Sequence, residues 1–209
     1  MPAEMNTEIL EQAFDDLGQM ARDSGLICEI AVYGGASLML ATDARDVTKD
    51  VDAAFLKEGE FIANAAKTIS GKRDLPQNWL NEAIAHMVNG RVGPPSKLTL
   101  FGEYPRDDNV PGLRVHLPTP EYILAMKLII SQRDDIEKAS RDRDDVVSLM
   151  RITKRCDKES MLATVRNFFP TVKGVDHRII ARIEDAIARE TETRPHDTSR
   201  QTWNAQRGR

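Results

Sequence analysis

Residues Ala31–Phe55, which read AVYGGASLMLATDARDVTKDVDAAF, combine a glycine turn with a pair of carboxylates. The apolar run Leu26–Val32 is typical of a buried strand and leads into Gly34-Gly35. Ala36–Ala41 then suits a helix of one or two turns, and Lys49–Phe55 returns as a second strand. The sequence therefore predicts a strand–turn–helix–strand unit around which the rest of the chain is arranged.

The segment Gly34–Ser37 has the chemistry of a phosphate-binding turn. Gly34 and Gly35 lack a Cβ atom, so the backbone can approach a ligand closely. Amide N–H groups at the start of a helix face an anion with the helix dipole behind them, and the Ser37 hydroxyl adds a further donor. Taken alone, the same residues also fit an ordinary turn between a strand and a helix.

Asp50 and Asp52 lie two positions apart on the second predicted strand, so both side chains emerge on one face. Two adjacent carboxylates repel one another unless a cation compensates. Mg²⁺ or Mn²⁺ would do so, and would leave coordination positions for water and substrate phosphates. A solvated strand edge is the alternative interpretation of the pair by itself.

The flanking segments complete an N-terminal α+β domain over residues 1–118. Asn6 or Thr7 is expected to cap a first helix that ends at Ser24-Gly25. Further elements are predicted as a helix at Glu58–Ser70, a polar turn at Gly71–Asn78, a helix at Trp79–Val88, a loop at Gly90–Ser96, and strands at Lys97–Phe101 and Leu113–Leu117. Alternation on the last strand puts Arg114 and His116 on one face.

A helical domain is predicted after Pro118, over residues 119–190. Thr119 is a plausible N-cap, and Pro120 is tolerated in a first helical turn. Helices are expected at roughly 121–134, 139–153, 158–168 and 175–190, joined by short connections that favour antiparallel packing. Residues 191–209 lack apolar periodicity and are expected to form a mobile tail. The overall expectation is a small mixed sheet flanked by helices, followed by a helical bundle.

Lys127 is the only charge in the apolar stretch Tyr122–Ile130. A buried ammonium needs an anion, although a lysine side chain can also extend to the surface. On the next predicted helix, the spacing places Asp142 and Asp145 beside the apolar face and Asp144 away from it. Lys127 is a candidate partner for the first two, and a solvated charged face is the alternative.

Two motifs together carry a resemblance to a known family. Tyr33-Gly34-Gly35-Ala36-Ser37 followed by Asp50-Val51-Asp52 resembles the signature of the nucleotidyltransferase superfamily that includes DNA polymerase β. Arg45 and Thr48 fit the R-x-x-T-x-D-x-D arrangement of its minimal and toxin-type members. The resemblance implies that the glycine turn contacts a nucleoside triphosphate and that the two aspartates bind catalytic Mg²⁺.

A second match lies in the helical part. Pro-x-Tyr-x-Leu-Ala-x-Lys-Leu followed by Arg-Asp-x-x-Asp-Val resembles the C-terminal motifs of AbiEii-type nucleotidyltransferases, which are toxins of bacterial toxin–antitoxin and phage-defence systems. In that family a lysine and an aspartate complete the active site. The match falls on Lys127 and Asp145, with Asp142 assigned to substrate binding. Both halves together span roughly residues 30–150.

One position departs from the superfamily pattern. A third acidic residue often lies on a later strand, but Leu113–Leu117 offers Arg114 and His116 instead. Glu103, near the preceding strand, is a substitute only if the strand register allows it. The departure leaves open whether the chain retains catalysis.

The resemblance implies transfer of a nucleoside monophosphate from a triphosphate to a hydroxyl on RNA, such as tRNA, or on protein, with a cognate antitoxin as a further partner. Gly34, Gly35 and Ser37 would hold the triphosphate, with Arg45 and Thr48 among the substrate-binding residues. Asp50 and Asp52 would bind the metal. Lys127 would neutralise phosphate charge, and Asp145 would act as the base or orient Lys127. A catalytically silent nucleotide-sensing fold and an antitoxin-like interaction protein are the alternatives.

Composition sets the remaining expectations. The 209 residues carry 41% hydrophobic and 30% charged side chains and a net charge of −4, which argues against dominant non-specific nucleic-acid binding. Cys28 and Cys156 are isolated, and the four histidines show no metal-binding spacing. No signal-peptide pattern or membrane-span-length apolar run is present, so a cytoplasmic protein without a membrane partner is expected.

Overall fold

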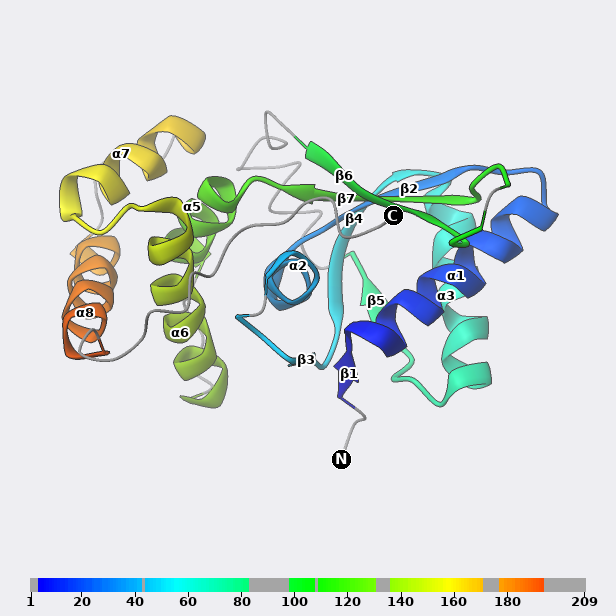
Figure 1. Cartoon of the computed structure of the whole chain (residues 1–209), viewed down its shortest axis with the longest axis horizontal. Helices are drawn as coiled ribbons and strands as arrows, with labels where there is room; N and C mark the ends of the chain where they lie inside the picture. Colours follow the sequence, from blue (N-terminus) through cyan, green and yellow to red (C-terminus); the bar gives the residue numbers. More distant parts are fainter. Residues whose placement is uncertain are drawn as a thin grey trace. The chain divides into compact units, whose positions relative to one another are not determined.

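A five-stranded mixed sheet forms the centre of the N-terminal part, in the order β5-β4-β2-β7-β6. The computed structural model describes residues 4–42, 44–82, 98–107, 109–130, 136–170 and 177–193. Two units divide the chain, one reaching Pro118 and the other starting at Thr119. The first combines helices with strands and the second is helical (Figure 1), which confirms the α+β class predicted from the sequence.

The elements of the N-terminal unit follow in chain order as β1 (Met5–Asn6), α1 (Thr7–Asp23), β2 (Cys28–Val32), α2 (Gly34–Ala41), β3 (Val47–Thr48), β4 (Val51–Lys57), α3 (Gly59–Arg73), β5 (Leu80–Asn81), β6 (Leu98–Tyr104) and β7 (Leu113–Pro118). β2 pairs antiparallel with β4 and parallel with β7. β6 is antiparallel to β7, β5 is parallel to β4, and β1 and β3 form a separate two-stranded sheet.

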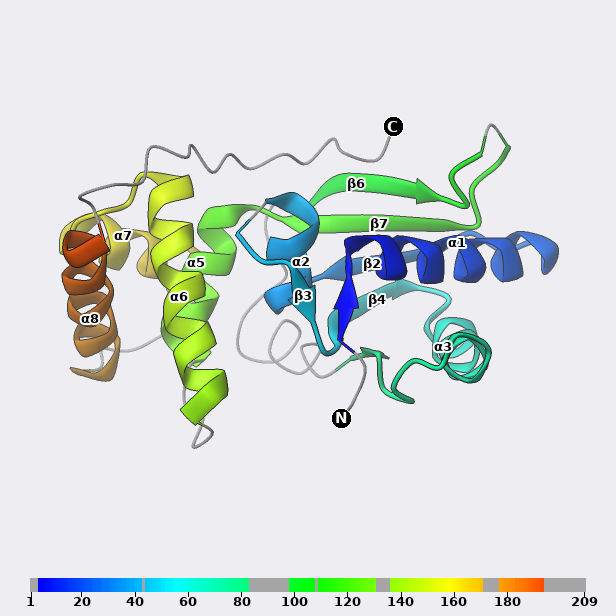
Figure 2. The same cartoon turned by 60° about the horizontal axis from the view of Figure 1, so that its bottom comes forward.

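Alternation along the strands separates a core face from a polar face. On β7, Leu113, Val115 and Leu117 are fully buried, whereas Arg114 and His116 are partly exposed, as the sequence pattern predicted. Helix α1 runs alongside β6 and β7 and packs against α3 (Figures 1 and 2). The fully buried apolar side chains of α1 lie on one face of the helix, which accounts for its amphipathic sequence. They are Leu10, Ala13, Phe14, Leu17 and Ala21.

The predicted helix at Trp79–Val88 is wrong where the structure describes it. Leu80 and Asn81 form β5 and pair with Val51 and Asp52. The Trp79 carbonyl accepts a hydrogen bond from the Val51 amide (2.6 Å), so a sheet partner distant in sequence overrides the local helical pattern. Residues 83–88 and the predicted loop at 90–96 lie outside the described residues.

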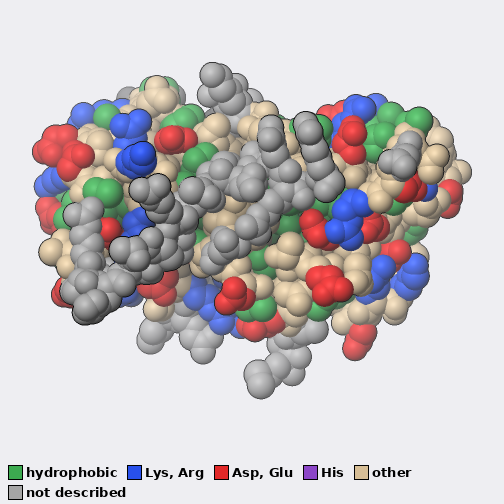
Figure 3. Space-filling view, viewed as in Figure 1, with side chains coloured by type: hydrophobic (Ala, Val, Ile, Leu, Met, Phe, Trp, Pro, Cys, Tyr) green, Lys and Arg blue, Asp and Glu red, His purple; other side chains and the backbone are tan. Residues whose placement is uncertain are grey.

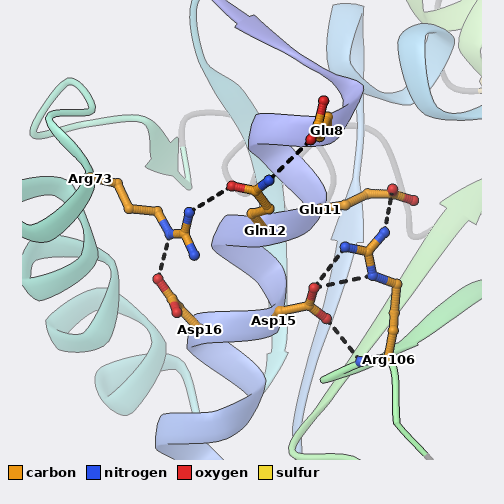
Figure 4. Close-up of polar contacts among 7 residues, drawn as sticks. All are labelled: Glu8, Glu11, Gln12, Asp15, Asp16, Arg73 and Arg106. Atoms are coloured by element: carbon orange, nitrogen blue, oxygen red, sulfur yellow. Dashed lines mark hydrogen bonds and ion pairs between the residues drawn. The ribbon is translucent and has the colours of Figure 1, made fainter.

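Polar residues of α1 connect it to two neighbouring segments (Figure 4). On one side, Asp16 is ion-paired with Arg73 of α3, whose guanidinium also donates to Gln12 (2.9 Å). On the other side, Asp15 accepts from the Arg106 backbone amide (2.8 Å) and from its guanidinium (2.7 Å). These contacts fix α1 laterally, in addition to its apolar packing.

Acid should weaken the ion pairs that α1 makes with its neighbours, because their carboxylates become protonated. These pairs include Asp16 with Arg73 and Arg22 with Asp107. Hydrogen bonding to Arg73 lowers the pKa of Asp16, and Arg22 lowers that of Asp107 from 3.8 to about 2. A lowered carboxyl pKa stabilises the fold above the unfolded value, and this contribution is lost as the pH falls through the folded value. We expect Asp16→Asn to cost about 1–2 kcal/mol at pH 7 and to flatten the loss of stability as the pH falls below the ordinary carboxyl pKa of 3.8. Urea unfolding at a series of pH values tests this; parallel pH curves would contradict it.

Close backbone packing joins α1 to the connection between β6 and β7. A Cβ atom at Gly18 would overlap the Tyr104 carbonyl, and one at Gly112 would overlap the Gly18 carbonyl. Both positions therefore require glycine because backbone atoms occupy the space of a side chain.

We expect Gly18→Ala to destabilise the protein by about 1–3 kcal/mol, since the backbone must shift to admit a methyl group. Gly71→Ala is the matched control, because Gly71 is also helical and a Cβ atom there would meet no atom within 4 Å. That substitution should leave stability unchanged or raise it by about 0.5 kcal/mol. Equal effects of the two substitutions on urea unfolding would contradict the packing argument.

The C-terminal unit contains α5 (Pro120–Ile130), α6 (Ile136–Thr153), α7 (Lys158–Phe168) and α8 (His177–Thr193). Helix α5 packs against the other three, and Tyr122 stacks edge-on against Phe168. Arg182 of α8 donates to the carbonyls of Leu128 (2.5 Å) and Ile129 (3.3 Å), near the end of α5. α8 continues to Thr193, into the segment expected to begin the tail. Among the described residues, no helix is long and apolar enough to cross a membrane.

Candidate functional site

The junction between β2 and α2 forms a tight turn at Gly34. Tyr33 is extended and precedes the helix, and Gly34 has a positive φ of 63°, which favours glycine. The Ser37 hydroxyl donates to the Gly34 carbonyl (2.8 Å), and the Ser37 side chain is fully buried. Ser37 therefore supports the shape of the turn in this structure, while Gly34 and Gly35 remain partly exposed.

Asp52 of β4 lies against this turn. A Cβ atom built on Gly34 would sit 3.1 Å from the Asp52 Oδ2 atom. The Tyr33 amide also donates to the Asp52 carbonyl (2.8 Å), so the pairing of β2 with β4 continues to the start of the turn. The structure thus brings one of the predicted metal-binding carboxylates directly to the first residue of the glycine turn.

Arg45 occupies the space beside the second glycine. A Cβ atom on Gly35 would overlap the Arg45 guanidinium, and the Arg45 Nε donates to the Val47 carbonyl (3.1 Å). The absence of a side chain at Gly35 therefore leaves room for the Arg45 guanidinium and also keeps the backbone partly exposed. A carboxylate and a guanidinium flank consecutive glycines at the first turn of α2.

Asp50 and Asp52 flank the fully buried Val51, and both are partly exposed. This agrees with the alternation expected of a strand, although β4 itself begins at Val51. Buried Thr48 donates its hydroxyl to the Asp50 carbonyl (2.8 Å) and so holds the backbone ahead of the strand. Thr48 therefore has a structural contact in this position.

The described residues contain no group of three or more His, Cys, Asp or Glu side chains placed to hold a metal ion. Mg²⁺ often uses only one or two protein carboxylates together with water and substrate phosphates. Asp50 and Asp52 fit that donor set because both carry oxygen ligands, both are accessible, and one lies beside a turn suited to phosphate.

The contact between Gly35 and Arg45 can be measured by a double-mutant cycle. Gly35→Ala should destabilise the protein while Arg45 is present, because the methyl group displaces the guanidinium. In an Arg45→Ala background the clash is absent, so the same change should cost less, with a coupling of about 1 kcal/mol or more. Urea unfolding of the four proteins measures this coupling. Additive effects of the two substitutions would show that the contact between Gly35 and Arg45 does not contribute to stability.

In the helical unit, Lys127 of α5 is bound by two carboxylates of α6. Its Nζ atom lies 2.6 Å from the Asp142 Oδ1 and 2.7 Å from the Asp145 Oδ2. The Lys127 and Asp145 side chains are about nine-tenths buried, whereas the Asp144 side chain is 69% exposed. The helical spacing predicted that the Asp145 side chain would be buried and the Asp144 side chain exposed. Lys127 also has the acidic partners expected for a buried ammonium.

The third acidic position remains without a simple replacement. Glu103 lies within β6 and accepts a hydrogen bond from the Arg114 Nε (2.9 Å). Arg114 also lies 3.7 Å from Glu29 of β2. Glu103 is thus ion-paired in this structure. No sequence pattern indicated that Glu29 would join Arg114, since only the strand register brings the two together.

The Cys28 thiol lacks the properties of a nucleophile. Burial raises the pKa of the Cys28 thiol to about 11, so it is protonated at neutral pH. Cys156 lies in the helical unit, and its thiol contacts the Met150 carbonyl (3.7 Å).

Comparison of the chain with protein-family models, with curated proteins and with solved structures returned no match.

Proposed function

We propose that the protein is a metal-dependent nucleotidyltransferase with a small mixed-sheet nucleotidyltransferase core. The observation that carries this proposal is the approach of Asp52 to Gly34, where a Cβ atom on the glycine would lie 3.1 Å from the Asp52 Oδ2. It joins a carboxylate of the type that binds Mg²⁺ to a turn of the type that binds phosphate. A metal-bound nucleoside triphosphate is a ligand that would use both.

The reaction transfers a nucleoside monophosphate to an acceptor hydroxyl. The hydroxyl oxygen forms a bond to the α-phosphorus and loses its proton, while the bond from that phosphorus to the oxygen bridging toward the β-phosphate breaks and pyrophosphate leaves. Bound Mg²⁺ or Mn²⁺ would supply charge stabilisation at the phosphates. Asp50 and Asp52 would hold the metal, and the Gly34 and Gly35 amides would orient the triphosphate.

Arg45 supports the same assignment. Its guanidinium lies over Gly35, where it adds positive charge to a helix start that already carries a positive partial charge. The combined positive charge of the guanidinium and the helix start disfavours a further cation beside Gly35 and favours an anion there. Phosphate oxygens would accept hydrogen bonds from guanidinium and amide N–H groups.

The resemblance also assigns Lys127, Asp142 and Asp145 of the helical unit to the reaction. Lys127 would offset negative charge on the phosphates, and Asp145 would accept the hydroxyl proton or orient the lysine. The ion pairs within that unit support an orienting role, because both carboxylates contact the ammonium directly.

An RNA or protein hydroxyl is the proposed acceptor, and toxin–antitoxin or phage defence is the proposed setting, with an antitoxin as partner. On the face drawn in Figure 3, the described Lys and Arg side chains are interspersed with Asp and Glu. This mixed surface fits an acceptor recognised through local contacts more than through a broad basic field.

A catalytically silent nucleotide-binding protein is the second candidate, favoured by the state of Glu103. Its carboxylate is engaged by Arg114, so the described strands present no unpaired acid at the third position. This version would bind triphosphate through the same turn without transferring it.

Transfer of label separates the two. The protein is incubated with Mg²⁺, total tRNA or lysate, and each of the four α-labelled triphosphates. We expect one nucleotide to label the acceptor, and Asp50→Asn and Asp52→Asn each to reduce labelling by at least about 100-fold. Asp46→Asn is the control, because Asp46 is exposed in the same segment. Binding of triphosphate without transfer of any nucleotide would establish the silent protein.

Lys127→Arg tests the helical residues separately. Arginine keeps a cation between Asp142 and Asp145, whereas removal of the cation would leave buried carboxylates and threaten folding. If Lys127 acts on phosphate, labelling should fall although stability changes little. Unchanged labelling would exclude a specific role for the ammonium.

A further inference from the structure

A second group of polar side chains lies on the central strands, away from the glycine turn. Glu29 of β2 pairs in register with Arg114 of β7, and Ala31 with His116. Because side chains two residues apart share a face of a sheet, Glu29 and His116 lie on the same side of these adjacent strands. Along β4, Glu29 is paired with Lys57, at the opposite end of that strand from Asp52.

The His116 imidazole has an unexplained nitrogen. Its Nε2 atom is buried and has no hydrogen-bond partner, although the side chain as a whole is 18% exposed. Buried polar atoms in native proteins nearly always have a partner, so an orphaned one indicates a proton, water or ion that completes it. The Glu29 Oε2 lies 3.5 Å from this nitrogen.

This separation suits a bridging metal ion. It exceeds the range of about 2.7–3.2 Å for an ordinary N–H···O hydrogen bond. A zinc ion with bonds of about 2.1 Å to both atoms would subtend an angle of about 110° between them, which is close to tetrahedral. The two atoms are therefore spaced as ligands of one ion.

Other charged side chains surround the Glu29 carboxylate. Arg114 approaches the other carboxylate oxygen of Glu29, at 3.7 Å, and donates its Nε to Glu103 at 2.9 Å. Lys57 of β4 is in register with Glu29, so two carboxylates and two cations balance here when the imidazole is neutral. Arg114 lies beside Oε1 of Glu29, whereas Oε2 is the oxygen nearer the imidazole.

We propose that Glu29 and His116 form a binding site for a divalent transition-metal ion of the zinc class. An imidazole nitrogen with one carboxylate oxygen suits Zn²⁺, whereas Mg²⁺ prefers oxygen ligands alone. Water completes the coordination. This site is distinct from the Asp50 and Asp52 pair and does not depend on the proposed transferase activity.

Isothermal titration of the full chain with Zn²⁺ at pH 7.5 tests the site. We expect wild-type protein to bind one zinc equivalent that His116→Gln and Glu29→Gln each weaken at least tenfold. His177→Gln is the control, because His177 is exposed at the start of α8, and it should leave the isotherm unchanged.

Circular dichroism establishes that each variant is folded, and the two variants act on separate strands, so a folding defect in one leaves the other informative. Loss of the same zinc equivalent in both variants supports the assignment. A wild-type isotherm that superimposes on that of a folded His116→Gln or Glu29→Gln variant would overturn it, including the case in which wild-type protein binds no zinc.

Discussion

The antiparallel pairing of β2 with β4 is the constraint on which the candidate site depends. It aligns Val32 with Ala53 and extends one step further through the hydrogen bond from the Tyr33 amide to the Asp52 carbonyl (2.8 Å). A slip of one residue would turn the Asp52 side chain to the opposite face of the sheet. The register therefore decides whether a carboxylate lies beside Gly34.

Arg45 and Lys127 carry their positive charges in different surroundings. Arg45 lies at a helix start, where a cation is disfavoured by about 0.3–1 kcal/mol. Lys127 is buried between Asp142 and Asp145, although apolar side chains of similar size often stabilise such positions equally well or better. The position of Arg45 fits the proposed binding of polyphosphate, and the main support for that proposal is the approach of Asp52 to Gly34.

Local patterns predicted most of the secondary structure and several contacts. The cap at Asn6, the alternation on β7 and the division of Asp144 from Asp145 each depend on neighbours within a few residues. Leu80 and Asn81 were misassigned because their partner, β4, lies far away in sequence. Two further contacts could not be predicted for the same reason. The contact of Arg45 with Gly35 follows from the path of the turn, and the approach of Glu29 to His116 follows from strand register.

Asp52 and the turn at Gly34 are proposed to act together on a metal-bound triphosphate, and the other roles proposed for the transferase reaction depend on this. The most direct measurement is the affinity for a non-hydrolysable nucleoside triphosphate with and without Mn²⁺, in wild-type protein and in Gly34→Ala. Alanine is strained at a φ of 63°, and its Cβ would press on the Asp52 carboxylate. We predict metal-dependent binding that Gly34→Ala weakens at least tenfold. Binding that ignores both the metal and the substitution, or no binding by wild-type protein, would contradict the proposal.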